Sequence, residues 1–490
     1  MASNDEIVAM VNDVMEDAGP RYKSLSSAFE QLISDGLLPP GQRLPTQREL
    51  ATLLGISRPT VVRVYESLRS KSLIEGTIGR GTYVRTASRS AQPRLSELID
   101  FERGASEADA GEIINLTVSK PELLPEFESA VQAIAGRAAG LAAAQAAYYP
   151  QGLPELRHLV AAWYSRRGLD TQPQQILITA GAQEALGLIV RLGLRPDGQF
   201  VIENPAYQGA LDIVRGRTSR IRPIPTGSDG TDIDFLRRAL VDAPQSPTLL
   251  MPTCHTITGA VTPIANREAI AALAQESAGV IIDDDVFAHL TFDQSSVPPL
   301  AAFAPDAPII TLGSTSKLVW GGLRVGWLRA SADLVRRLAR VKGTTTLGTS
   351  LVAQLIAVEL LGDLEGVAHR RVAEAMARDR QATELLKSTL PDWSWNPPKG
   401  GVSMWLRLPE GASATAFSAM AASYGVSVAP GPMFAANGEG DDHLRLVFMQ
   451  SEATLDQGIQ RLGAAWEHFR SMGEFCPEYL DWHKSTQGAT

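Results

Sequence analysis

The stretch "TLGSTSKLVWGGLRVGWL", residues 311–328, sets one lysine, Lys317, among small hydroxyl residues and glycines, with Arg324 seven residues further on. An ammonium group is costly to bury unless it is paired or neutralised. Taken alone, the segment is better explained by an ordinary loop lysine whose head reaches water. Other segments of the sequence are needed to tell whether Lys317 is a buried, neutralised amine or an ordinary loop lysine.

The length and composition of the chain indicate a globular protein of several domains. Its 490 residues are too many for one ordinary core, and 44% are hydrophobic and 20% charged. The two cysteines, Cys254 and Cys476, are too few for a disulfide framework, and their spacing excludes a common zinc site. Residues 1–20 are acidic and lack a signal-peptide core, and no apolar run approaches the roughly 18 residues of a membrane span. We therefore expect a cytoplasmic protein without membrane contact or a metal.

The charge of the chain is distributed unevenly. The net charge is −9, yet residues 20–90 hold eleven Lys or Arg against five Asp or Glu. That segment carries +6, which leaves about −15 on the remainder. A basic module joined to an acidic body is typical of a nucleic-acid-binding module on a larger protein.

The basic segment has the pattern of a helix-turn-helix. Thr46 and Glu49 form a capping box at the start of one helix, which ends at the turn residue Gly55. Ser57 caps a second helix that opens with Ser-Arg-Pro-Thr. We expect Leu50, Leu53, Leu54, Val61, Val64, Tyr65 and Leu68 to face a core. The following "LIEGTIGRGTYV", residues 73–84, is typical of a β-hairpin, or wing.

Residues 22–84 resemble the winged helix-turn-helix of the GntR family. The resemblance rests on the segments "GQRLPTQRELATLLGISRPTVVRVYESL" and "GRGTYV". The resemblance implies DNA contacts by Arg48, Ser57, Arg58 and Thr60, and by Arg80 on the wing in the minor groove. Arg63 has two open interpretations, a phosphate contact or a solvated face. The alternative for the whole segment is a three-helix interaction module, which gives the wing and its arginine no purpose.

The body beyond a polar linker, residues 86–112, alternates between strands and helices. Strand-like runs are "QILITA", "QFVIE", "RIRPIP", "TLLMP", "GVIIDDD", "APIITLG" and "RVGWLRA". Helical stretches such as "AQEALGLIVRLGL" separate several of them. This order predicts an α/β fold with a mostly parallel sheet that helices cover on both faces. Functional groups are then expected where strands end and helices begin.

Three strand ends carry residues of the types that bind ligands or take part in catalysis. The first is the start of a helix at residues 181–183, where free N–H groups suit a phosphate. The second is a run of three aspartates at 283–285, whose adjacent charges need a cation. The third is Lys317, which follows Ser314 and Ser316. A phosphate site, an acid and a lysine at one sheet edge describe a pyridoxal phosphate site. Arg324 would complete the phosphate site with its guanidinium group.

Residues 113–470 resemble the fold-type I aminotransferases, with a large sheet domain and a smaller C-terminal α+β part. The resemblance implies that Lys317 is the catalytic residue, which forms the Schiff base with pyridoxal 5'-phosphate. It implies that the phosphate is held by Ala182, Gln183, Ser314, Ser316 and Arg324. Tyr207 of "ENPAYQG" would stack on the cofactor ring, and Asp284 would bond its nitrogen.

Two further segments resemble parts of the aminotransferase site. Arg445 of "HLRLVF" would bind the carboxylate of the substrate. "YYPQGLPELR", residues 148–157, is similar to the segment whose tyrosine reaches the phosphate of the partner subunit. The spacing here is one residue short, so the resemblance implies either Tyr148 or Tyr149.

The chain departs from the aminotransferase pattern at two places. Residues 256–259 are Thr-Ile-Thr-Gly where the family has Asn-Pro-Thr-Gly, so the asparagine that bonds the ring hydroxyl is missing. The family also has a tyrosine shortly after the ring aspartate, where this chain has Val286 and Phe287. Cys254 or His255 would be a substitute, although His255 is also explained as an ordinary loop histidine.

The whole layout resembles that of MocR-type regulators, with a DNA-binding domain at 20–85, a linker at 86–112, a cofactor-binding domain at 113–470 and a tail at 471–490. The resemblance implies a homodimer with exchanged DNA-binding domains that binds double-stranded operator DNA. A small amine or amino acid would form an external aldimine at the cofactor and change DNA binding. Two alternatives are an aminotransferase with a DNA-binding appendage, and a regulator that senses pyridoxal phosphate itself.

Overall fold

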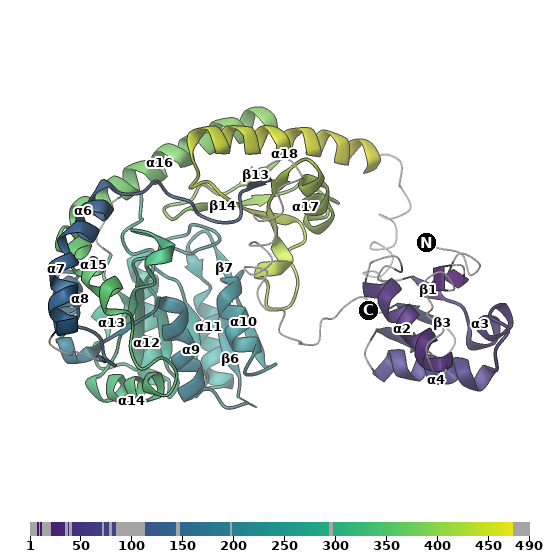
Figure 1. Ribbon diagram of the computed structural model, residues 1–490, viewed down its shortest axis with the longest axis horizontal. Helices are drawn as coiled ribbons and strands as arrows, with labels where there is room; N and C mark the ends of the chain where they lie inside the picture. Colours follow the sequence, from purple (N-terminus) through teal and green to yellow (C-terminus); the bar gives the residue numbers. More distant parts are fainter. Residues whose placement is uncertain are drawn as a thin grey trace. The chain divides into compact units, whose positions relative to one another are not determined.

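The computed structural model describes residues 7–8, 10–11, 21–34, 38, 42–70, 73–77, 81–84, 113–143, 148–196, 198–293 and 297–473. The chain divides into two compact units, an N-terminal unit, Met1–Gln92, and a body, Pro93–Thr490 (Figure 1). The linker at 86–112, the residues 474–490 of the tail and the wing residue Arg80 lie outside the described residues.

The N-terminal unit contains the predicted helix-turn-helix and a small sheet. Its helices are α2 (Arg21–Ser34), α3 (Gln47–Leu53) and α4 (Arg58–Ser70), and its strands are β1 (Arg43–Leu44), β2 (Ile74–Thr77) and β3 (Gly81–Val84). The strands pair antiparallel in the order β1-β3-β2, as a hairpin requires. Thr46 and Glu49 form the expected capping box, in which the Glu49 N–H donates to Thr46 Oγ1 at 3.2 Å.

The core of the N-terminal unit follows the predicted apolar pattern with one exception. Leu25, Phe29, Leu32, Leu50, Val61, Val64, Tyr65 and Leu68 are buried together. Leu53 is instead 40% exposed, because α3 is only seven residues long and Leu50 and Ala51 take its buried face. The prediction that Leu53 faces the core is therefore wrong. Tyr65 ties the helices to the preceding loop by donating its hydroxyl to Pro45 O at 2.5 Å.

The body is built on an eight-stranded sheet in the order β5-β12-β11-β10-β9-β6-β7-β8. The strands are β5 (Ile176–Thr179), β6 (Phe200–Asn204), β7 (Ile221–Gly227), β8 (Gly230–Thr231), β9 (Thr248–Leu250), β10 (Ile281–Asp284), β11 (Ile309–Ser314) and β12 (Gly326–Arg329). Neighbours from β11 to β7 run parallel, whereas β12 is antiparallel to both β11 and β5. The predicted α/β class with a mostly parallel sheet is confirmed.

Helices cover both faces of the large sheet (Figure 1). Within one strand the side chains alternate: Ile176 and Ile178 pack into one apolar cluster and Leu177 into another. The first cluster includes α8 (Pro154–Arg166), α11 (Ile233–Asp242), α12 (Ile264–Glu276), α13 (Leu300–Phe303) and α15 (Leu351–Gly362). The second includes α9 (Ala182–Gly193), α10 (Gln208–Arg215) and α14 (Ala332–Gly343). Two buried layers therefore hold the strand ends in fixed positions.

The C-terminal part of the body is the expected smaller α+β part. Strands β13 (Ser394–Trp395), β14 (Ser403–Arg407), β17 (His443–Val447) and β16 (Ala429–Pro430) form an antiparallel sheet in that order, and α16 (Leu364–Thr389), α17 (Ala414–Ser423) and α18 (Glu452–Gly473) pack with it. Strand β4 (Ile114–Asn115), at the start of the body, pairs with β15 (Val426–Ser427), so the two ends of the body meet. In the described part of the chain, every helix is too short or too polar to span a membrane.

Candidate functional site

The site centres on the turn that joins β11 to β12, where the sequence sets Lys317. Thr315 fixes this turn, because its N–H and its hydroxyl both donate to Val325 O, at 3.0 and 2.9 Å. Ser314 and Ser316 hydrogen-bond through their hydroxyls at 2.9 Å. Lys317 follows them and is half-buried. The expected order of hydroxyls and amine at one strand end is therefore present.

The amine of Lys317 lies among groups that disfavour its charge. Burial is the main cause that lowers its pKa to about 8, and the guanidinium groups of Arg445 and Arg324 add to the effect, while Asp284 opposes it. A lysine with this pKa has a much larger neutral fraction near pH 7 than an ordinary lysine, and the neutral amine is the form that attacks a carbonyl. The surroundings of Lys317 therefore favour its neutral amine, the form that covalent chemistry with an aldehyde requires, although the side chain as a whole is half-buried.

A candidate anion site lies at the start of α9, close enough for Arg324 to act on the amine of Lys317. Gly181 precedes the helix with φ of 107° and has no capping side chain, so the first N–H groups of α9, at Ala182 and Gln183, have no helical partner. Arg324 reaches the same point and donates to Ala180 O at 2.6 Å. The φ of 107° at this position favours glycine, and a Cβ atom there would also lie 2.8 Å from Arg324 Nη2, which would have to move.

The anion site and the hydroxyl turn are neighbours because of the strand order. Gly326 on β12 pairs with Thr179 on one side and with Ser314 on the other. A Cβ atom at Gly326 would lie 2.6 Å from Gly181 Cα, so the absence of a side chain there lets the two segments approach. The structure thus brings Ala182, Gln183, Ser314 and Arg324 to one place, as predicted.

Tyr207, just before α10, covers the same place. Its hydroxyl donates to Gln183 Oε1 at 3.0 Å. A Cβ atom at Gly209 would lie 2.7 Å from the Tyr207 ring, so this glycine gives the ring its space. Burial is the main cause that raises the pKa of Tyr207; Asp284 adds to it, and Arg445 and Arg324 oppose it. Tyr207 therefore lies in the electrostatic field of the whole cluster.

Asp284 is the acid that the end of β10 presents to the site. Burial raises its pKa to about 7, and its Oδ1 accepts the Val286 N–H at 3.2 Å. The other two aspartates lie on the opposite face of the sheet, where Asp285 forms an ion pair with Arg167. Asp283 accepts the Leu300 N–H at 2.9 Å and lies in the field of Arg267. The cations that the aspartate run needs are thus two arginines of the protein, while Asp284 alone faces Lys317.

Arg445, on β17, has a guanidinium group that the protein leaves largely uncommitted. Its Nε donates to Ser403 Oγ at 3.2 Å, and Ser403 donates to Thr256 O at 2.9 Å. Its carbon Cζ lies 5.7 Å from the centre of the Phe434 ring. Burial lowers the pKa of Arg445 to about 10, and among the described residues no carboxylate forms an ion pair with it. The two terminal nitrogens of Arg445 are therefore free to bind an anionic group.

Tyr148 lies apart from this cluster. It is 67% exposed, and with Tyr149 it lines a cavity of about 590 Å³ that also includes Arg157, Arg336 and Arg340. A role toward the phosphate of a partner subunit stays a prediction for both tyrosines.

The two candidate substitutes beside the departures from the aminotransferase pattern, Cys254 and His255, are buried groups with shifted pKa values. Cys254 is buried, which raises the pKa of its thiol to about 12. Burial lowers the pKa of His255 to about 4, and its Nδ1 accepts the Thr258 N–H at 3.2 Å. Phe287 is part of the apolar core. These contacts favour a structural role for His255 in the turn of residues 255–258.

On the N-terminal unit, the residues proposed to contact DNA lie at the surface around the two helix starts. Arg48, Ser57 and Arg58 are exposed, Thr60 is half-buried, and the Ser57 and Thr60 hydroxyls lie 2.8 Å apart. Arg63 is exposed, with its guanidinium carbon 6.0 Å from the centre of the Tyr22 ring. The predicted contact by Arg80 lies outside the described residues.

Sequence reasoning missed two residues that support the site. Ser403 holds Arg445 in position, and Arg167 neutralises Asp285. Both contacts join residues far apart in the chain, and neither residue lies in a recognisable motif.

Comparison with known proteins gives two family matches. Residues 111–462 match the family described as aminotransferase class I and II, and residues 21–84 match the bacterial regulatory proteins of the gntR family. A 2-aminoadipate transaminase of Thermus thermophilus is 34% identical over 70% of this chain and 87% of its own length. The HTH-type pyridoxine biosynthesis transcriptional regulator PdxR of Corynebacterium glutamicum is 28% identical over 77% of this chain and 81% of its own. The crystal structure of the α-aminoadipate aminotransferase LysN from T. thermophilus matches with a TM-score of 0.68 and 27% identity, over 77% of this chain and all of that one.

Proposed function

The chain belongs to the aminotransferase class I and II family and has a gntR-family domain at its N-terminal side. From this we propose that it is a transcriptional regulator that senses a small amine or amino acid. The regulator YdfD of Bacillus subtilis, named an HTH-type transcriptional regulator, is similar over 91% of this chain and 96% of its own, at 26% identity. That alignment spans nearly all of both chains, so it supports assigning a regulatory role to the whole protein rather than to one domain.

The cofactor of the aminotransferase body is pyridoxal 5'-phosphate, and the residues present fit it. Its phosphate suits the free N–H groups of Ala182 and Gln183, the hydroxyls of Ser314 and Ser316, and the guanidinium of Arg324. When bound, the cofactor supplies an aldehyde that condenses with primary amines and a ring that acts as an electron sink. Lys317 would supply the amine that attaches the cofactor, and the carboxylate of Asp284 would accept a hydrogen bond from the protonated ring nitrogen.

The free guanidinium of Arg445 is the observation that carries the sensing proposal. A ligand that has both a primary amine and a carboxylate can displace Lys317 and bind Arg445 at once. The site lacks the asparagine and the tyrosine of the aminotransferase pattern, with Thr256 and Phe287 in their places. Binding without efficient turnover is the behaviour that a sensor needs.

The DNA-binding side of the proposal rests on the exposed residues at the starts of α3 and α4. Arg58 and Thr60 lie where a recognition helix presents its first turn to the major groove. Arg48 and Ser57 would contact phosphates, and Arg80 would contact the minor groove. The basic charge of residues 20–90 favours binding to the DNA backbone.

The proposal includes a homodimer in which each DNA-binding unit lies on the body of the other subunit. In that dimer the exposed Tyr148 or its half-buried neighbour Tyr149 would reach the phosphate of the partner's cofactor. Sedimentation of the holoprotein gives the mass of the assembly. A monomer at micromolar concentration contradicts this part of the proposal.

The test combines two measurements on one sample. The holoprotein is titrated with a panel of amines and amino acids while its visible absorbance is recorded, and its affinity for a DNA duplex selected from a random pool is measured with and without each compound. We expect at least one compound to change both readings at the same concentration. If no compound that alters the absorbance changes DNA affinity, the sensing proposal is wrong.

A second candidate function is a working aminotransferase with a DNA-binding appendage. The similarity to the T. thermophilus 2-aminoadipate transaminase favours it, as does the retention of Lys317 and Arg445. Multiple turnovers with an amino donor and a 2-oxo acid would establish it. A single half-reaction without turnover agrees with sensing instead.

A third candidate is a regulator that senses pyridoxal phosphate itself. The name of the relative PdxR, a pyridoxine biosynthesis regulator, favours it. Titration of the apo-protein with the cofactor alone, with DNA affinity as the readout, separates this candidate from amine sensing.

A further inference from the structure

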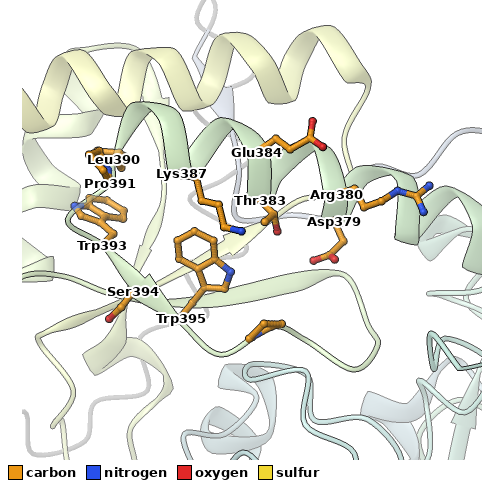
Figure 2. Close-up of a pocket in the computed structure, with 11 residues that line it drawn as sticks. Asp379, Arg380, Thr383, Glu384, Lys387, Leu390, Pro391, Trp393, Ser394 and Trp395 are labelled. Carbon is orange, nitrogen blue, oxygen red and sulfur yellow. The ribbon is translucent and has the colours of Figure 1, made fainter.

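A second cavity lies in the C-terminal part of the body, between α16 and β13 (Figure 2). Its volume is about 570 Å³. The residues that carry the argument are Asp379, Thr383, Lys387, Leu390 and Trp395. None of them belongs to the cluster around Lys317, so this cavity is independent of the function proposed above.

The polar side chains of α16 divide into two groups around this cavity. Asp379, Thr383 and Lys387 are four residues apart and so share one face of the helix. Figure 2 shows all three extending toward the Trp395 ring, whereas Arg380 and Glu384 extend away from it. The cavity therefore presents one carboxylate, one hydroxyl and one ammonium group above an aromatic ring.

The carboxylate of Asp379 is poorly compensated by the protein. Its Oδ1 is shut off from water and has no hydrogen-bond partner in the described part of the chain. Burial raises the pKa of Asp379 to about 6, with Arg380 opposing the shift. Because Oδ1 is closed to solvent, a ligand in the cavity would meet Oδ2 of this half-buried side chain, where an ammonium group can compensate the charge of the carboxylate.

The charges that line the cavity balance, and this balance selects the ligand. Of the four charged residues around it, the two whose side chains extend into the cavity, Asp379 and Lys387, have opposite charges, whereas Arg380 and Glu384 extend away from it. A ligand with one net charge would be attracted at one end of the cavity and repelled at the other, whereas a zwitterion is attracted at both ends. Trp395, Leu390 and Pro391 add an apolar surface that suits an apolar side chain.

The spacing along α16 suits a small molecule. Asp379 and Lys387 are eight residues apart, about 12 Å between backbones at the helical rise per residue. A helical lysine side chain leans toward the N-terminal end of its helix, and Lys387 does so in Figure 2, which shortens the gap between the two charges.

We propose that this cavity binds a free apolar amino acid, with its ammonium at Asp379, its carboxylate at Lys387 and its side chain over Trp395. Such a site would let the protein respond to an amino acid without chemistry at Lys317.

The test uses the full-length holoprotein that carries Arg445→Ala, which disables the carboxylate clamp of the Lys317 site. Binding of L-leucine is measured by equilibrium dialysis while the visible absorbance is followed. We expect one saturable L-leucine site per chain without a change in absorbance. The truncated analogues 3-methylbutylamine and 4-methylpentanoate should each bind about tenfold more weakly, because each lacks one charge-assisted contact.

Three variants in the same background locate the site. Asp379→Asn and Lys387→Met should each weaken L-leucine binding about tenfold, since each removes one charged partner. Glu384→Gln is the matched control on the same helix and should change binding less than about twofold, because its side chain extends away from the cavity. The proposal is overturned if Arg445→Ala protein binds no L-leucine saturably, or if Asp379→Asn and Lys387→Met bind it as the parent does. Equal binding of 3-methylbutylamine and L-leucine also overturns it.

Discussion

At the scale of single residues, the lowered pKa of Lys317 leads to a pH prediction. Its ordinary pKa is near 10.5, and in the folded protein burial and two arginines bring it to about 8. A lowered lysine pKa means that the proton is lost at lower pH, so the reactive amine accumulates as pH rises through 8. We expect the rate of cofactor attachment to the apo-protein to rise with pH and to level off above about 8.5. Visible absorbance after mixing measures this rate, and a rate that keeps rising to pH 10 contradicts the assignment.

Removal of the same amine should abolish covalent attachment. Lys317→Ala is expected to lose the visible band and, after borohydride reduction, the mass adduct of one cofactor per chain. Lys399→Ala is the matched control, because Lys399 is an exposed lysine held by Asp229 at 3.3 Å. A yellow Lys317→Ala protein with a reduced adduct would place the attachment on another lysine.

Ser403 yields a prediction that separates the effector site from the cofactor site. It accepts from Arg445 and donates to Thr256 O, so it holds the guanidinium group toward the cluster. A hydrogen bond to a charged group contributes about 1.5–3 kcal/mol, which corresponds to roughly ten- to a hundredfold in affinity. Ser403→Ala should weaken effector binding by such a factor and leave the cofactor band in place.

The spectral titration that defines effector binding measures this effect. Ser277→Ala serves as the control, since Ser277 also donates its hydroxyl to a backbone carbonyl, Pro244 O at 3.1 Å, and lies in the large-sheet part of the body. Equal effector affinity in Ser403→Ala and wild type would mean that Arg445 keeps its position without this hydrogen bond.

At the scale of elements, the first turn of α4 gives a prediction about DNA. Arg58 opens the helix and is exposed, as a base-reading arginine must be. Arg58→Ala should cost about 1–3 kcal/mol of operator binding and relax specificity at one base pair. If Arg58 contacts only phosphate, affinity should fall evenly across sequences and the salt slope should flatten by about one unit. Arg63→Ala, five residues further along α4, is the comparison variant. Operator binding by Arg58→Ala that equals wild type would contradict the assignment of α4 as the recognition helix.

Elements that are local in sequence could be predicted, and those that depend on distant partners could not. The Thr46 capping box and the Ser314–Lys317 turn are each formed by residues close together in the sequence, so pattern and spacing identify them. Asp285 was predicted to need a cation, yet Arg167 lies 118 residues away, and no spacing rule points to it. The antiparallel direction of β12 and the Ser403 contact to Thr256, 147 residues away, likewise depend on the completed fold.

At the scale of the whole molecule, the chain joins a basic DNA-binding unit to an acidic body that carries the proposed sensing site. An effector can shift the DNA-binding equilibrium only by its different affinity for the two arrangements of the molecule. Exchange of Lys317 for an effector amine changes the charge next to Asp284 and Arg445, and this local change has to favour one arrangement. Couplings of this kind are typically about 1–3 kcal/mol, or about five- to 150-fold in affinity.

We expect the coupling between effector binding and DNA affinity to depend on Arg445. Arg445→Ala is expected to keep the cofactor band and the basal affinity for DNA, because the residues proposed to hold the phosphate lie at the start of α9 and at Arg324, and those proposed to contact DNA lie on α3 and α4. It should lose the amine-induced change in both absorbance and DNA affinity, since the effector carboxylate has lost its partner. Absorbance and operator binding are measured with and without the amine. Arg407→Ala, an exposed arginine on the same sheet that pairs with Asp442, should respond as wild type does. An unchanged amine response in Arg445→Ala would remove Arg445 from the effector site and leave the coupling to groups nearer Lys317.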